Sequence, residues 1–217
     1  MIVATRKPIE EIIGFLAPYD SILILGCGTC VTVCNSGGER EVALIHSALR
    51  VAQTKGLLDG KRFHEYTVKR QCDNEFLEAI KGKSYEVDAI LTLACGVGVQ
   101  VLAEFFPHVV CIPGLNTLFM GSSSKLGIWD ERCAGCGDCR LYETGGICPI
   151  TRCAKGILNG PCGGSKDGKC EVDREMDCGW IMIYERLLKL GRVQTLRTYV
   201  PPREYSLKKK PKRVMIA

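Results

Sequence analysis

The chain has 217 residues, a formal net charge of +5 and 14 cysteines. This length accommodates one or two domains with an apolar core, and a hydrophobic fraction of 46% is ordinary for a globular protein. Apolar stretches stop short of the ~20 residues that a membrane span needs, and residues 1–15 lack the pattern of a signal peptide. We therefore expect a cytoplasmic protein without a membrane segment. In that compartment cysteines stay reduced, and they bind metal more often than they form disulfides.

Residues 1–120 alternate between helical and strand-like patterns, which predicts an α/β domain with a small parallel sheet covered by helices. The first helix is expected at 7–18, where Pro8 lies near the first helical position. A continuous apolar run at 21–27 is typical of a buried parallel strand. Further helices are expected at 37–56, 74–82 and 96–106, and further strands at 63–71, 87–94 and 108–114.

Cysteines follow three of the four predicted strands. Because parallel strands present their carboxyl ends at one edge of a sheet, thiols from separate loops should meet there. Four of the five would form a metal or cluster site, and one would be a bystander. The candidates are Cys27, Cys30, Cys34, Cys72 and Cys95.

Three further features of the first half lie outside this predicted metal site or allow another interpretation. Cys111 continues an apolar strand and is expected in the core. The residues "GCGTC" at 26–30 lack the third glycine of a dinucleotide fingerprint, but their Cys-x-x-Cys spacing also fits a thioredoxin-like redox pair. The histidines His46, His64 and His108 lie outside the cysteine-rich loops, so we expect them to be structural or exposed.

The second half of the sequence is rich in cysteines but has little apolar surface with which to form a core. We expect a linker at 121–127 ("GSSSKLG"), a cysteine-rich domain at 128–196 and a basic tail at 197–217. The cysteine-rich part is glycine-rich and cannot bury enough apolar surface to offset its ordering entropy, whereas metal–thiolate bonds can supply that stability. Its candidate ligands are Cys133, Cys136, Cys139, Cys148, Cys153, Cys162, Cys170 and Cys178.

Eight thiolates suit two four-ligand sites of zinc or of iron–sulfur clusters. The triplet Cys133, Cys136 and Cys139 followed by Cys148-Pro149 favours iron–sulfur, because this is the arrangement of ferredoxins rather than of paired zinc motifs. Zinc at one site remains an alternative. The pairing stays open; one scheme places Cys178 with the triplet and leaves the other four for a second cluster.

A helix is expected at 179–196, with Ile181, Tyr184, Leu187 and Leu188 on one face. The tail carries a basic cluster without aromatic interleaving or a nucleic-acid-binding motif, so we expect a solvated segment and no nucleic-acid partner. Its members are Lys208, Lys209, Lys210, Lys212 and Arg213.

Two groups of motifs resemble a known family. The run "CAGCGDCRLYETGGICPITRCAKGILNGPCGG", with "GKCEV" and "CGWIMIYERL" after it, resembles the cysteine-rich domain at the C-terminus of some methylenetetrahydrofolate reductases. Together with "GCGTC", "GGEREV", "QCDNEF" and "LACGVGVQ", nearly all of residues 20–190 resembles the small iron–sulfur subunit of the acetogen-type enzyme.

The resemblance implies a non-catalytic electron-transfer subunit. It would carry two to three [4Fe–4S] clusters and accept low-potential electrons from ferredoxin or a larger electron-transfer complex. These would pass to the FMN of a flavin-containing methylenetetrahydrofolate reductase subunit, which reduces methylene- to methyl-tetrahydrofolate in the Wood–Ljungdahl pathway. FMN would be bound only by that partner. The alternatives are a zinc-stapled scaffold subunit and a thiol–disulfide oxidoreductase that uses Cys27 and Cys30.

Overall fold

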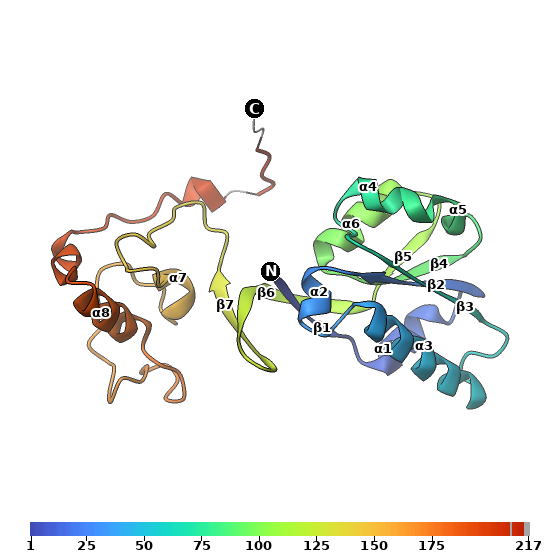
Figure 1. The fold of residues 1–217 in the computed structure, drawn as a ribbon, viewed down its shortest axis with the longest axis horizontal. Coiled ribbons are helices and arrows are strands. Elements are labelled where there is room, and N and C mark those ends of the chain that lie inside the picture. The colour runs from blue at the N-terminus through green and yellow to red at the C-terminus, as the bar shows by residue number, and fades with distance from the viewer. Residues whose placement is uncertain (209, 215–217) are drawn as a thin grey trace. The chain divides into compact units, whose positions relative to one another are not determined.

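The computed structural model describes residues 1–208 and 210–214 (Figure 1). The chain divides into two compact units, Met1–Trp129 and Asp130–Ala217. Within the described ranges, no helix combines the length and the apolar character that crossing a membrane requires.

The first unit is built on a four-stranded parallel sheet, as the alternating pattern predicts. Its strands are β2 (Ser21–Cys27), β3 (Arg62–Val68), β4 (Ala89–Leu93) and β5 (Val110–Pro113), in the order β3-β2-β4-β5. Every residue of β2 is buried, which explains its uninterrupted apolar run, since a central strand is covered on both faces.

Helices cover the two faces of this sheet. Figure 1 shows α1 (Ile9–Leu16) and α3 (Glu39–Thr54) on one face and α6 (Gly96–Phe105) on the other. Side chains of β2 alternate between the two cores: Ile22 and Ile24 lie in the first hydrophobic cluster, and Leu23 and Leu25 in the second. The predicted helices and strands of this unit are therefore confirmed, with one exception.

The exception is the helix expected at 74–82, which is broken into three short pieces. These are α4 (Asn74–Leu77), a 3₁₀ turn η1 (Glu78–Ile80) and α5 (Lys81–Ser84). Ile80 leaves the helical region at φ −111° and ψ 7°, and Gly82 is a poor helix former. A second short helix, α2 (Cys30–Val33), follows β2.

A second sheet was not anticipated. It has the order β1-β6-β7, formed by β1 (Ile2–Arg6), β6 (Leu115–Lys125) and β7 (Ile128–Cys133), with β1 antiparallel to β6. The prediction of a linker at 121–127 was therefore wrong. Most of that segment is strand, and Gly127 takes the positive φ of +77° in the turn before β7. The serines mimic a linker because much of this strand is exposed.

The second unit has little regular structure. It contains α7 (Pro149–Arg152), α8 (Gly179–Lys189) and two 3₁₀ turns, η2 (Val193–Arg197) and η3 (Tyr205–Lys208). Its small core consists of Cys178, Trp180, Ile183 and Leu187, with partly buried neighbours around them.

The helix expected at 179–196 is confirmed only over α8, because it ends at Lys189 and η2 follows as a separate 3₁₀ turn after Gly191. Its predicted face was also partly wrong. Tyr184 and Leu188 are 44% and 57% exposed, whereas Trp180 and Ile183 are buried. The sequence offers two apolar stripes on this helix, and packing selects the one that includes Trp180. The predicted basic tail reaches beyond the described ranges at residues 209 and 215–217.

Candidate thiol sites

Four cysteines of the first unit line one small cavity at the carboxyl edge of the parallel sheet. The cavity has a volume of about 130 Å³, and its other walls are mostly apolar. The thiols come from the end of β2, from α2, and from the loops after β3 and β4. The four are Cys27, Cys30, Cys72 and Cys95.

Local hydrogen bonds fix the segments that carry these thiols. The N–H of Cys27 donates to the carbonyl of Gly37 at 2.9 Å, and its own carbonyl accepts from the Thr32 hydroxyl at 2.7 Å. Cys95 is the N-cap of α6, where the helix dipole favours a negatively charged sulfur.

A buried glutamine anchors the loop of Cys72. The side-chain amide of Gln71 donates to the carbonyls of Leu25 at 2.9 Å and Gly26 at 3.1 Å, and its oxygen accepts from the hydroxyl of Thr92. The residue beside a candidate ligand thus ties its loop to two strands of the sheet.

The three loops also meet electrostatically. The pKa of the Cys72 thiol is raised, first by partial burial of its sulfur and then by the negative charges of Cys27 and Cys95. Sulfurs that interact electrostatically in this way would repel one another as thiolates, and a bound cationic group would offset that repulsion.

Two further cysteines of the first unit have other surroundings. Cys34 is buried, and its sulfur lies 3.5 Å from the Ser36 hydroxyl and 3.7 Å from the Ala4 carbonyl. Cys111 packs against the hydrophobic cluster under α6, as expected, and burial raises the pKa of its thiol to about 11.

A second cavity, in the second unit, is also lined by four cysteines. Its volume is about 290 Å³, and Pro149, Ile150 and Leu158 supply apolar walls. Gly135 and Gly137 adopt positive φ, and the N–H of Gly135 donates to the Cys133 sulfur at 3.4 Å. The cysteines are Cys133, Cys136, Cys139 and Cys148. Cys148 rather than Cys178 thus lies with the triplet, unlike the pairing scheme drawn from the sequence.

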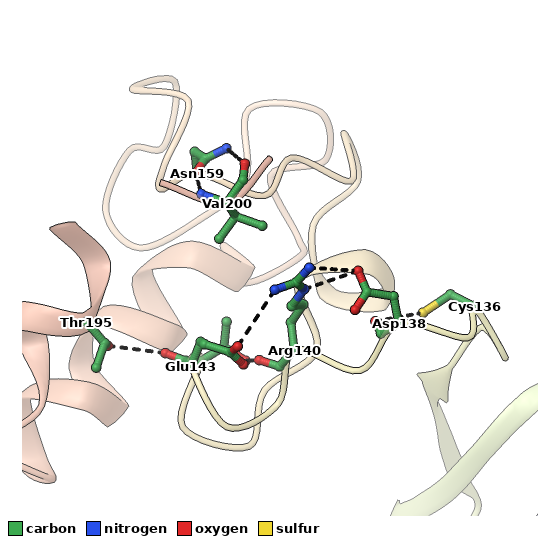
Figure 2. A network of polar contacts seen from close by, with 8 residues as sticks. Cys136, Asp138, Arg140, Glu143, Asn159, Thr195 and Val200 are labelled. Carbon is green, nitrogen blue, oxygen red and sulfur yellow. Dashed lines mark hydrogen bonds and ion pairs between the residues drawn. The ribbon is translucent and has the colours of Figure 1, made fainter. Parts of the chain in front are cut away.

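An arginine connects this cysteine loop to the C-terminal part of the unit (Figure 2). Arg140 forms ion pairs with Asp138 at 3.0 Å and Glu143 at 3.8 Å. The carbonyl of Glu143 in turn accepts from the hydroxyl of Thr195 in η2 at 3.2 Å. Reasoning from cysteine spacing alone missed Arg140, although both acidic partners are its near neighbours in the sequence.

Of the remaining four cysteines, two belong to the core of the second unit and two lie outside it. Cys178 is the N-cap of α8 and belongs to the same apolar cluster as the partly buried Cys153. The N–H of Cys170 donates to the Met176 carbonyl at 2.8 Å. The pKa of Cys162 is lowered, first by a hydrogen bond from the Gly164 N–H and also by Lys155.

The histidines have structural roles or face solvent. His46 pairs with Glu65, and His108 stacks on Tyr85 with ring centroids 4.1 Å apart. His64 is exposed. Among residues 1–208 and 210–214, no three histidine, cysteine or acidic side chains converge closely enough to hold a single metal ion.

The fold and the sites define a chain with a parallel-sheet α/β unit followed by a cysteine-rich unit. Residues 112–206 match the family model described as methylene-tetrahydrofolate reductase C terminal. The match covers less than half of the chain; it contains the eight cysteines from Cys133 to Cys178 but not those of the first cavity. Neither the curated proteins nor the solved structures gave a match.

Proposed function

We propose that this chain is an electron-transfer subunit that carries [4Fe–4S] clusters and serves a flavin-containing methylenetetrahydrofolate reductase subunit. The carrying observation is that each of two cavities is lined by four cysteines, and four thiolates are the donor set of a [4Fe–4S] cluster. The family match of residues 112–206 supports the choice of partner.

The ligands divide into three sets of four under this proposal. Cys27, Cys30, Cys72 and Cys95 form the first set, and Cys133, Cys136, Cys139 and Cys148 form the second. Elimination assigns the third set in the second unit. Cys34 and Cys111 are the two bystanders, because their sulfurs face the protein core. The third set is Cys153, Cys162, Cys170 and Cys178.

The surrounding residues fit an anionic, electron-carrying group. A bound cluster would supply one-electron exchange. The chain's own groups hold and tune it: the Gly135 N–H points at a cysteine sulfur, the α6 N-terminus stabilises negative charge at Cys95, and the other walls of the first cavity are mostly apolar. Hydrogen bonds to the sulfurs and the polarity of the surroundings set the reduction potential of a cluster.

We place the chain between a low-potential donor, ferredoxin or a larger electron-transfer complex, and the FMN of the partner. The partner's flavin reduces methylene- to methyl-tetrahydrofolate, as in the Wood–Ljungdahl pathway. In this role the chain binds neither flavin nor folate itself. A zinc-stapled scaffold is the rival, since zinc also binds four thiolates and would stabilise the small core of the second unit.

Metal analysis separates these two functions. The protein is purified without oxygen, and iron, acid-labile sulfide and zinc are counted per chain. We expect about twelve irons, four for each set of cysteines. A colourless protein that holds only zinc would refute electron transfer and leave the scaffold.

Two matched variants test the ligand assignment in the first cavity. Cys72→Ala should remove about four irons per chain, because Cys72 lines the cavity with the other three thiols. Cys34→Ala is the control and should leave the iron content unchanged, because the Cys34 sulfur hydrogen-bonds to the Ala4 carbonyl and the Ser36 hydroxyl instead. An unchanged iron content in Cys72→Ala would remove it from the ligand set.

A further inference from the structure

Asn159 holds the segment that follows η2 by a two-point contact. Its side-chain nitrogen donates to the carbonyl of Val200 at 2.8 Å, and its side-chain oxygen accepts from the N–H of Val200 at 2.7 Å (Figure 2). The amide thus forms with Val200 the same pair of bonds that a residue of a neighbouring strand would form. Residues 198–204, between η2 and η3, are named here the strap.

The strap carries an arginine to the second cavity. Pro201 and Pro202 follow the contact with Asn159, and two prolines with fixed φ make a stiff extended spacer of roughly 3.1 Å per residue. Next comes Arg203, which lines the cavity of Cys133, Cys136, Cys139 and Cys148. Its guanidinium donates to the carbonyl of Cys136 at 3.3 Å.

No carboxylate in the described part of the chain neutralises the positive charge of Arg203. Arg140, which lines the same cavity, is neutralised by Asp138 and Glu143. Arg203 forms no ion pair with a carboxylate of residues 1–208 or 210–214. Four thiolates around a cluster leave a net negative charge, and an unneutralised guanidinium beside it has the matching sign.

We propose that the strap, latched by Asn159, positions Arg203 as the charge partner of the anionic centre held by Cys133, Cys136, Cys139 and Cys148. This inference rests on the proposed function for the identity of the centre. A positive charge stabilises the reduced, more negative state, so Arg203 raises the reduction potential. It also covers the cavity and slows loss of the metal.

The test uses the full chain, purified without oxygen, with a redox titration followed by electron paramagnetic resonance. Arg203→Met should make reduction of one cluster about tenfold less favourable, a fall of about 59 mV for a one-electron couple. Arg203→Lys keeps the charge and should shift the potential less. Asn159→Ala should shift the same cluster in the same direction, because it keeps the arginine in the chain but releases the strap that holds Arg203 at the cavity.

Arg197→Met is the matched control. It removes the same charge from an exposed residue at the end of η2 that does not line the cavity, and it should leave the potential unchanged. The second measurement is the rate at which a chelator removes metal, which should rise severalfold in Arg203→Met and Asn159→Ala only.

Cys136→Ala separates failure of this inference from failure of the proposed function. If it removes about four irons while Arg203→Met changes neither the potential nor the chelation rate, the strap inference is overturned and the electron-transfer function stands. If the protein holds only zinc, the proposed function fails, yet faster zinc release in Arg203→Met would still support the strap. If Cys136→Ala leaves all metal in place, Cys136 is not a ligand and the strap inference fails, whereas the iron count per chain still decides the proposed function.

Discussion

Replacing Gln71 by leucine should loosen the edge of the sheet that carries the first set of cysteines. The residue is fully buried, and its side chain makes three hydrogen bonds that join the loop of Cys72 to β2 and β4. Leucine has a similar size but offers neither donor nor acceptor. The Thr92 hydroxyl then loses its acceptor in an apolar environment.

The magnitude follows from these three bonds. Each contributes about 1 kcal/mol net, so the free energy of opening this region should fall by about 3 kcal/mol. Thr92→Val is the matched control, because it removes a single bond and should cost about 1 kcal/mol. Both values are large against a total stability of roughly 5–15 kcal/mol.

Amide hydrogen exchange read by mass spectrometry localises the effect. A loss of 3 kcal/mol accelerates exchange roughly a hundredfold, and we expect this in peptides that cover β2 and β4 but not in those that cover α8. The iron content of the first site should fall in parallel, because Cys72 follows Gln71 directly. Unchanged exchange in β2 and β4 would refute the anchoring role of Gln71.

Three further outcomes follow from single residues. Gly14→Ala should raise the unfolding free energy by about 0.5–1 kcal/mol in chemical denaturation, because an added Cβ in the interior of α1 meets nothing within 4 Å; a destabilised variant would contradict the environment described. Gly179→Ala should destabilise the second unit and lower its metal content, since its Cβ would lie 2.3 Å from the Arg152 carbonyl; an unaffected variant would count against this packing. Cys111 should carry about a hundredfold less thiolate at pH 8 than an unperturbed thiol, because its pKa rises from 9.0 to about 11; site-resolved alkylation of native and unfolded protein measures this, and equal rates would exclude it.

Local sequence patterns predicted most helices and strands of the first unit, because residue type and hydrophobic periodicity indicate the same elements there. The apolar run of β2 indicates a strand buried on both faces, and the structure buries all seven residues. The helix at 39–54 is similarly marked at its start, where the Glu41 carboxylate accepts from the N–H of Gly38 at 2.9 Å. Such signals lie within a few residues of one another, so they can be read before the chain folds.

The pairing of strands that lie far apart in the sequence could not be predicted from local patterns. β1 and β6 pair across more than 100 residues, as Ile2 opposite Met120 shows, and nothing near residue 120 marks a polar, serine-rich segment as a strand. The buried face of α8 was predicted only in part, for a related reason. Two apolar stripes compete on that helix, and the choice depends on what packs against it, such as the Ile157 carbonyl that accepts from the Trp180 indole.

The sequence alone determined which residue types are available: fourteen thiols, a triplet at Cys-x2-Cys-x2-Cys spacing, and cysteines at the ends of parallel strands. Tertiary structure decided which thiols share a cavity. It set Cys34 apart from the first cavity, grouped Cys148 with the triplet, and brought Arg203 to the same place. Spacing along the chain limits only near neighbours, whereas a four-thiol site depends on the convergence of separate loops. That convergence is set by the sheet in the first unit, and in the second unit by contacts between loops such as the hydrogen bond from Arg203 to the Cys136 carbonyl.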